Sequence, residues 1–370
     1  MKDSIQAYFS FLEGNSYEIG RRQGEEIKKI PNAMNAVLLS EPIDEAKFKD
    51  MEKLMNQYCP SLIEELQGFA DSLNVKPSYL NFFDEALLHP GGCSLGAVLP
   101  SKTNDSKTYV LRNYDLSPAI SDMRLCTTKV KGKYSHTGFS VSYFGRSEGL
   151  NEKGFCVAFA SCGMPVGKHL GMKKPIIKGL QFMVIVRALL ENCKNVEEGI
   201  SYLKEMPIGT NMNLLLADAN SNAALIETYD GEKAVEIVNN KSEFIIATNH
   251  ALFPNISRKE NGMLEQSRVR YDLMETNFKS NDFISKNHLR SLTLNEYPEG
   301  LTVHNYKQNF GTVHSILFDL DAKQLEFSFG SPIHNKICKI TVGEALPYFD
   351  LNVFIENTDY GPNFWRIIDK

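Results

Sequence analysis

The stretch Leu88-His89-Pro90-Gly91-Gly92-Cys93 divides this sequence into two parts of different character. A proline followed by two glycines ends a helix and leaves a flexible link. Before this stretch the apolar residues follow a helical period, whereas after it they form the short runs that are typical of β-strands. We therefore expect a boundary at Gly92, with one unit formed by residues 1–92 and another by residues 93–370.

The unit of residues 1–92 is predicted to be largely helical. Within residues 62–73 the apolar side chains recur with the period of a helix, and the acidic side chains fall mostly off that stripe. A further helix is expected over residues 79–88, because Pro77 suits the first turn of a helix. The sequence thus predicts a helical segment that ends just before Cys93.

The unit of residues 93–370 is predicted to be rich in short strands. Two helices are expected to interrupt the strands, at residues 180–193 and 196–203. Strand runs that are broken by helices, without a regular strand–helix–strand repeat, favour an α+β layered fold. The expected strands are residues 109–111, 139–144, 155–160, 213–217, 223–227, 234–238, 244–247, 313–318 and 325–329.

Charge and hydropathy exclude several classes of function. A formal charge of −5 and scattered lysines and arginines leave no basic footprint for nucleic acid or for an anionic membrane. The N-terminus is broken by charges, and no stretch approaches the length of an apolar membrane span. We expect a cytoplasmic protein without nucleic-acid or membrane partners.

The cysteines do not form a recognisable scaffold. There are seven of them, an odd number, and their spacing contains neither a CxxC pair nor a zinc pattern. A reducing compartment is therefore expected, with most cysteines acting as small buried apolar residues. No metal site and no cofactor are predicted.

Cys93 is the exception, because its context suits a nucleophile. A thiol attacks only as the thiolate and needs a base. If the chain were cut between Gly92 and Cys93, the new α-amino group, with a reference pKa of roughly 7.7–8.0, would be that base. Glycine also permits the backbone conformations that such a cut requires. Taken alone, the Gly-Gly-Cys sequence favours a cysteine in a loop over a nucleophile.

Arg112 and Asp115 follow Cys93 on or just past a predicted strand. An aspartate can hold a new amino terminus, and an arginine can orient a thiolate. Residues three apart on a regular strand point to opposite faces, so we expect the strand to bulge or end near Tyr114 if both are to face Cys93. The alternative is an ion pair at the surface.

Further polar residues end a strand and begin a helix. Asn249, after an apolar strand, could donate its side-chain N–H to a developing oxyanion. His250 could be the general base of a Cys/His pair. Ser267 and Arg268 lie in an expected helix. Each of these residues also has a structural interpretation, at a strand end or on a helix surface.

The order of these motifs is more informative than any one of them. From the N-terminus they are Gly14, Glu18-Ile19-Gly20, Gly24, Gly92-Cys93, Arg112, Asp115, Asn151-Glu152-Lys153-Gly154, Thr248-Asn249-His250, Ser267-Arg268 and Gly330-Ser331-Pro332. In this order they resemble the isopenicillin N acyltransferase family of N-terminal-nucleophile hydrolases. More distantly, they resemble the choloylglycine hydrolases, which include bile-salt hydrolases and penicillin V acylase.

The resemblance implies a four-layer αββα sandwich with a helical pro-segment. It also implies autocatalytic cleavage into residues 1–92 and 93–370, which then stay associated. Cys93 would attack the carbonyl of a linear amide or a thioester, with its own α-amine as the base. The substrates would be N-acyl amides, or acyl-CoA together with an amine. An oligomer is compatible with this reading.

The resemblance also implies roles for individual residues. Asp115 would hold the amine, and Arg112 would lie beside the thiolate. Asn249 would supply one oxyanion donor, and a backbone N–H near Ser161 would supply the second. Arg268 would support the site, assisted by Ser267, with His250 as a neighbour of the site.

Two features depart from the choloylglycine hydrolases. Ser161 stands where those enzymes have an asparagine, and 92 residues precede Cys93 where they have a short pro-piece or none. Both features favour the acyltransferase branch. Two alternatives stay open at this point. One is a Cys/His hydrolase that does not cleave itself and uses His250 or His314; the other is a non-catalytic relative that binds a ligand.

Overall fold

The computed structural model describes residues 3–30, 33–83, 91–163, 166, 172–238, 243–346 and 349–369. Half of the helix expected over residues 79–88, and the link before Gly91, lie outside these ranges. The described part of that region forms two short 3₁₀ helices, Pro77–Tyr79 and Asn81–Phe83.

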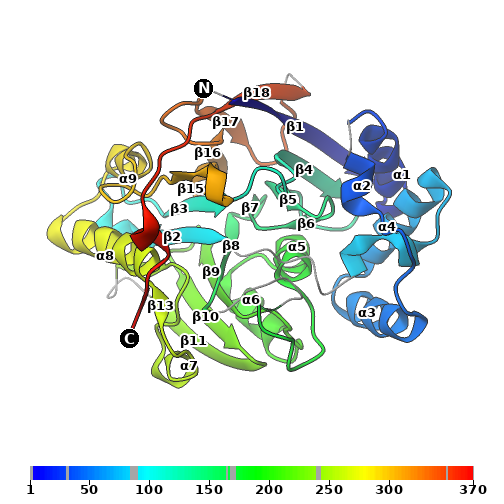
Figure 1. Cartoon of the computed structure of the whole chain (residues 1–370), viewed down its shortest axis with the longest axis horizontal. Helices are drawn as coiled ribbons and strands as arrows, with labels where there is room; N and C mark the ends of the chain where they lie inside the picture. The colour runs from blue at the N-terminus through cyan, green and yellow to red at the C-terminus, as the bar shows by residue number, and fades with distance from the viewer. Residues whose placement is uncertain are drawn as a thin grey trace.

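The largest sheet has ten strands and is mostly antiparallel (Figure 1). Its strands lie in the order β11 (Glu232–Val238), β10 (Ala223–Tyr229), β9 (Met212–Asp218), β8 (Phe155–Ser161), β7 (Glu148–Asn151), β5 (His136–Val141), β4 (Arg124–Val130), β1 (Asp3–Gly14) and β18 (Asp350–Ile355), and β6 (Gly145–Arg146) pairs with β5.

The second sheet carries Cys93 near its edge. Its order is β12 (Phe244–Ala247), β2 (Gly92–Val98), β3 (Tyr109–Leu116), β15 (Phe310–Asp319), β16 (Gln324–Phe329) and β17 (Cys338–Thr341), and β14 (His304–Asn305) pairs with β15. A separate small pair joins β13 (Met263–Leu264) to β19 (Ile367–Ile368).

Helices cover the outer face of each sheet (Figure 1). One buried cluster packs helices against the outer face of the larger sheet through Phe159 and Leu214, and another does so for the second sheet through Met274 and Phe278. A third cluster lies between the sheets and includes Cys93. The helices are α1 (Ser16–Ile27), α2 (Ala33–Val37), α3 (Glu45–Tyr58), α4 (Pro60–Leu73), α5 (Phe182–Asn192), α6 (Val196–Leu203), α7 (Pro254–Ser257), α8 (Glu265–Ser280) and α9 (Lys286–Thr293).

These layers confirm the expected αββα sandwich. All the expected strands form, and the helix expected at residues 196–203 is α6 with the same bounds. The Asn-Glu-Lys-Gly sequence is the turn between β7 and β8, where the Asn151 side chain accepts from the backbone of Lys153 and Phe155.

The largely helical N-terminal unit needs one correction, because residues 3–14 form the strand β1. This strand pairs with β4 in parallel and with β18 antiparallel. Ala7 and Phe9 are two positions apart on the same face of this strand, and both enter the core between the sheets. The described part of this segment therefore contributes one strand to the larger sheet in addition to its helices.

Helices α1 and α4 cross closely at glycines. A Cβ at Gly20 would lie 1.9 Å from the backbone oxygen of Glu65, and a Cβ at Gly68 would lie 2.1 Å from that of Tyr17. Only glycine permits this distance between the backbones. The glycines near the N-terminus thus have a packing role in the helical pair.

A buried ion network fastens this helical pair to α5. Arg187 of α5 contacts Glu65 of α4 at 2.5 Å and Glu191 at 2.6 Å, and all three side chains are fully buried. Gln23 of α1 also donates to Glu65, at 2.6 Å. Charges in a low-dielectric interior persist only when they are paired, so this network specifies how α1, α4 and α5 pack.

The chain contains no helix, within the part described, that is both long and apolar enough for a membrane span. All seven cysteines are buried and have free thiols.

Replacing Glu65 with alanine should destabilise the fold strongly, because Arg187 would lose one of its two buried carboxylates. We expect the free energy of unfolding to fall by about 3–5 kcal/mol, measured by urea titration. Glu64→Ala, at the exposed neighbouring position, should change it by no more than about 0.5 kcal/mol. Equal effects of the two substitutions would show that the buried network contributes little.

Candidate active site

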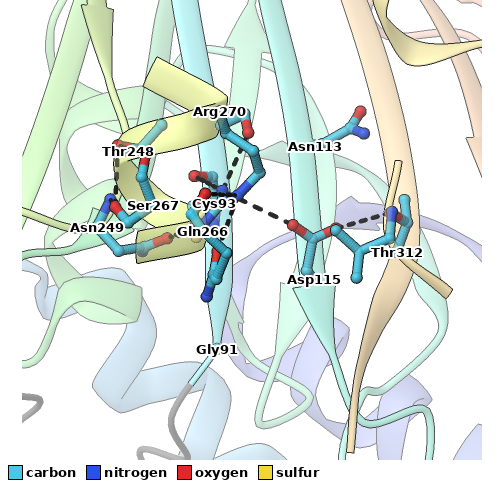
Figure 2. A network of polar contacts seen from close by, with 12 residues as sticks. Gly91, Cys93, Asn113, Asp115, Thr248, Asn249, Gln266, Ser267, Arg270 and Thr312 are labelled. Atoms are coloured by element: carbon cyan, nitrogen blue, oxygen red, sulfur yellow. Dashed lines mark hydrogen bonds and ion pairs between the residues drawn. The ribbon is translucent and has the colours of Figure 1, made fainter. Parts of the chain in front are cut away.

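Cys93 lies at the beginning of β2, where the two sheets meet (Figure 2). Its side chain is fully buried. Strand β3 flanks it on one side, with Tyr114 opposite Cys93 and Asp115 opposite Gly92. On the other side β12 ends at Ala247, two residues before Asn249. The backbone of Cys93 is therefore paired with β3 on one side and lies just beyond the end of β12, which pairs with β2 only as far as Leu95, on the other.

Arg112 approaches Cys93 from between the sheets. Its guanidinium interacts with the Cys93 thiol, lies 4.6 Å from the Tyr114 ring centroid and donates to Glu148 of β7 at 3.0 Å. His314 of β15 contacts the other oxygen of Glu148, also at 3.0 Å. The thiol thus faces an arginine that is itself held by a buried carboxylate.

Asp115 lies on the opposite face of β3, toward α8 (Figure 2). Thr312 donates to its Oδ1 at 2.7 Å, and Nη1 of Arg270 is 3.9 Å from its Oδ2. Asp115 Oδ2 is buried and has no hydrogen-bond partner. A buried acceptor without a donor is uncommon, and here it adjoins the Gly92–Cys93 bond.

The expected bulge in the strand of Arg112 and Asp115 is wrong. Strand β3 pairs regularly with β2 throughout, and the register shift lies in β15, between Thr312 and His314. Arg112 and Asp115 stay on opposite faces and reach different parts of Cys93. The thiol points to the Arg112 side, while the backbone nitrogen and carbonyl are reached from the Arg270 side.

Asn249 binds the backbone nitrogen of Cys93. Its Oδ1 accepts from Cys93 N at 2.8 Å and from Arg270 Nη2 at 3.0 Å, and its Nδ2 donates to the backbone oxygen of Ser161 at 3.1 Å and to Ser161 Oγ at 3.0 Å. The two groups at Oδ1 are obligate donors, so the amide orientation is fixed by chemistry.

Ser267 and Ser161 both lie at the site, as expected. Ser267 Oγ accepts from the backbone nitrogen of Asn249 at 2.9 Å, which positions that residue. Ser161 Oγ lies 3.4 Å from the backbone oxygen of Gly91. The backbone N–H groups of Cys162 and Gly163, however, donate to the carbonyls of Asn211 and Asn249. The oxyanion donor expected near Ser161 is thus engaged in this arrangement.

The placement of Arg268 at the site is wrong, and Arg270 occupies that place. The Arg268 side chain is 48% exposed and pairs with Asp272, whereas that of Arg270 is fully buried. Arg270 donates to the backbone oxygen of Cys93 and to Ser94 Oγ. The sequence did contain a signal, because Gln266, Arg270, Met274 and Phe278 recur every four residues on one helix face.

Glu148 is a second residue that the sequence analysis missed as a site residue. It precedes the Asn-Glu-Lys-Gly turn in a short buried strand and has no local feature that distinguishes it. Burial acts to raise its pKa, but His314 and Arg112 hold the pKa below its usual range. It is therefore the carboxylate that balances the Arg112 charge.

Burial also dominates the electrostatics of the other groups. It raises the pKa of the Cys93 thiol, and Arg112 opposes that shift. It raises the pKa of Asp115, opposed by Arg270 and by the Thr312 hydrogen bond. In the intact chain the thiol therefore favours its neutral form, and the Cys93 nitrogen, which is still part of a peptide bond, is not a base.

The two histidines considered as bases have other contacts. His250 Nδ1 lies 2.9 Å from Ser267 Oγ and 3.2 Å from Thr248 Oγ1. The His314 ring stacks on Phe139 with centroids 3.8 Å apart. Burial lowers the pKa of His314. These positions favour structural roles for both.

A cavity of about 720 Å³ adjoins Cys93. It falls within the ~300–1,000 Å³ typical of sites for small organic ligands. Both parts of the chain contribute to its wall: Ile30 and Val37 come from the N-terminal part, and Leu116 and Phe159 come from the part after Cys93. Among the described residues no group of His, Cys, Asp and Glu is arranged to hold a metal ion.

Comparison with known proteins identifies a family. Residues 102–334 match the family described as acyl-coenzyme A:6-aminopenicillanic acid acyl-transferase. No sequence among curated proteins gives a match.

Solved structures with a similar fold include a variant of the conjugated bile acid hydrolase from Clostridium perfringens, with 16% identity, coverage of 72% of this chain and 98% of that one, and a TM-score of 0.45. Penicillin V acylase from Agrobacterium tumefaciens has 16% identity, 67% and 86% coverage, and a TM-score of 0.43. A Caenorhabditis elegans ortholog of N-acylethanolamine-hydrolyzing acid amidase has 14% identity, 62% and 93% coverage, and a TM-score of 0.43.

Substitution at Arg270 and at Arg268 should have very different effects. Arg270→Met would remove the donor from the Cys93 carbonyl and from Asn249, and the nearest cation from Asp115. We expect it to lower the free energy of unfolding by about 3–5 kcal/mol, and Arg268→Met to change it by about 0.5 kcal/mol or less. Urea unfolding of both variants measures the two losses of stability. A larger loss in Arg268→Met than in Arg270→Met would contradict the placement of Arg270 at the site.

Proposed function

Because this chain belongs to the acyl-coenzyme A:6-aminopenicillanic acid acyl-transferase family, we propose that it is a self-processing cysteine amidase or acyltransferase. It would cut its own Gly92–Cys93 bond and then form an acyl-Cys93 intermediate from a linear amide or a thioester. The observation that carries the proposal is the position of Cys93. Its thiol faces Arg112, its backbone is held by Asn249 and Arg270, and it borders the cavity.

The unpartnered oxygen of Asp115 supports cleavage at this bond. Asp115 lies opposite Gly92, and its buried Oδ2 has no donor in the intact chain. Cleavage would turn the Cys93 amide into an ammonium group, which has three donors in place of one. The charge-assisted hydrogen bond that then forms to Asp115 stabilises the cleaved state. The same bond would hold the amine in position as the base.

The cleavage step would proceed through a thioester. Cys93 Sγ attacks the carbonyl carbon of Gly92, the Gly92–Cys93 C–N bond breaks, and the proton lost by the thiol passes to the Cys93 nitrogen, which becomes the free amine. Water then hydrolyses the thioester and releases the Gly92 carboxylate and the Cys93 thiol. Arg112 stabilises the thiolate at the start and at the end of this sequence.

Turnover would repeat this chemistry on a substrate. The α-amine of Cys93 takes the thiol proton, the thiolate attacks the substrate carbonyl, and the leaving amine or thiol departs with the proton. We assign the side-chain N–H of Asn249, at Nδ2, as a donor to the oxyanion. In the intact chain this group donates to Ser161, and a substrate oxygen would replace Ser161 as its acceptor. Water or an amine then receives the acyl group.

Residues 1–92 would stay bound after cleavage. Strand β1 lies between β4 and β18, and Glu65 is paired with Arg187 in the core. Loss of the segment would expose this surface and leave Arg187 with Glu191 alone. The cleaved protein is therefore proposed to be a stable pair of chains.

Intact mass of the purified protein is the direct test. We expect two chains, residues 1–92 and 93–370, that elute together by size exclusion. Cys93→Ala should give one chain of 370 residues and no acyl-enzyme. Cys193→Ala, a matched change of another buried cysteine, should be cleaved like the wild type. An active wild-type protein that stays one chain would refute self-processing.

The residue before Cys93 should accept no side chain. A Cβ at Gly92 would lie 2.1 Å from Cζ of Phe310, whose ring packs against Phe364 and Trp365. Gly92→Ala should therefore displace the bond to be cut and slow cleavage by at least about tenfold, as a small misplacement of reacting atoms does. Mass spectrometry over time after synthesis measures the rate.

The double substitution Gly92→Ala with Phe310→Ala is the control for this clash. It should recover cleavage relative to Gly92→Ala alone, because the ring that blocks the new methyl group is gone. A double variant that is cleaved as slowly as the single one would show that the Phe310 contact does not limit the reaction.

A further inference from the structure

The cavity beside Cys93 contains one carboxylate with a free oxygen. Asp122 and Arg124 are the charged residues in the described lining of this cavity. Ser140 Oγ and the backbone nitrogen of Tyr143 both donate to the same oxygen of Asp122, Oδ2, at 2.6 and 2.7 Å. Oδ1 receives neither bond, so it is available to a ligand in the cavity.

Arg124 is not available to balance that carboxylate. Its Nε donates to Ser10, its Nη1 to Gln23 and to the backbone oxygen of Tyr143, and its Nη2 to Glu26. The guanidinium also lies 3.9 Å from the Tyr143 ring centroid. It is engaged on all three nitrogens and cannot turn to a substrate without breaking these contacts.

The surrounding charges leave one negative charge in excess. Around Asp122 the described network, in which Asp122 and Glu26 are partly exposed, contains four carboxylates and three guanidinium groups. Arg146 pairs with none of these carboxylates, because its hydrogen bonds go to backbone oxygens and to Thr128. The carboxylates are Asp122, Glu26, Glu65 and Glu191, and the guanidinium groups are Arg124, Arg146 and Arg187. A buried excess charge is costly unless a counter-charge arrives.

Asp122 also holds a strained turn, but that role does not require its charge. Ser142 and Tyr143 have φ values of 50° and 69°, in the left-handed region, and the bond from Tyr143 N to Asp122 fixes this turn. The amide oxygen of an asparagine would accept the same two hydrogen bonds. The carboxylate is therefore explained better by a ligand than by the turn.

Resting on the proposed function, we propose that the substrate is an amide that carries a protonated amine on an apolar chain, and that Asp122 Oδ1 binds this ammonium group. Apolar residues such as Leu116, Ile120 and Met123 line the cavity around the chain. Burial raises the pKa of Asp122 in the empty cavity, and a bound ammonium group would offset that effect.

The test compares three series of p-nitroanilides on the cleaved wild-type enzyme. Their acyl groups have four to eight carbons and end in an ammonium group, a methyl group or a carboxylate. A fourth set, N-hexanoyl diamines against N-hexanoyl alkylamines, places the charge on the leaving amine. For the ammonium probe of the best length, kcat/KM should exceed that of the methyl probe by about 10- to 100-fold, as expected for a charge-assisted hydrogen bond. The carboxylate probes should be the poorest.

Asp122→Asn is the matched variant, since it keeps the bonds to Ser140 and Tyr143 and removes the charge. The ratio of ammonium to methyl probe should fall to about one, and the variant should still be cleaved into two chains. Glu25→Gln removes a charge at an exposed position of α1 and should keep the wild-type ratio.

The outcomes separate the two proposals. A wild-type protein that neither cleaves itself nor turns over any probe refutes the proposed function. A cleaved enzyme that turns over methyl probes as well as or better than ammonium probes at every length, on both sides of the amide, refutes only the role of Asp122. So does an ammonium preference that persists in Asp122→Asn. The comparison of ammonium, methyl and carboxylate probes on the wild-type enzyme still tests the proposal if Asp122→Asn does not fold.

Discussion

The guanidinium of Arg270 organises the site around one peptide unit. It donates to the backbone oxygen of Cys93, to Ser94 and to Asn249, and it is the cation nearest to Asp115. These groups come from β2, from the end of β12 and from β3, so one side chain of α8 joins three strands of the second sheet. Its burial is tolerated because Gln266 and these acceptors satisfy its donors. Without it, the position of Cys93 relative to Asn249 would depend on the bond from Cys93 N to Asn249 Oδ1.

The N-terminal part of the chain is inseparable from this arrangement. Strand β1 extends the larger sheet, and the pairing of Glu65 with Arg187 fastens α4 to α5. The same part of the chain forms one wall of the cavity that Cys93 borders. A cut at Gly92 would therefore release a chain end without releasing the segment. The cavity, and with it the choice of substrate, depends on both pieces.

Asp115 and Asp122 are two carboxylates whose hydrogen bonds leave one oxygen for a further partner. At Asp115 a buried oxygen lacks a donor, which an amino terminus at Cys93 would supply. At Asp122 one oxygen faces the cavity in a region with one carboxylate in excess, which a cationic substrate would balance. In both places the surrounding hydrogen bonds hold the carboxylate rigidly, so a partner would meet a pre-organised acceptor.

The local pattern of the sequence determined the expected strands, α6 and the layered class, because these follow from apolar periodicity. The motif order indicated Cys93, Arg112, Asp115, Asn249, Ser161 and Ser267, and the structure brings all six together. Residues 3–14 were expected in a largely helical unit but form the strand β1, whose partners β4 and β18 lie far along the chain. The choice of Arg270 over Arg268, the pairing of Arg112 with Glu148 and the free oxygen of Asp122 were decided only by tertiary structure. Each depends on which face of an element is buried and on what lies opposite, and residues distant in the chain supply both.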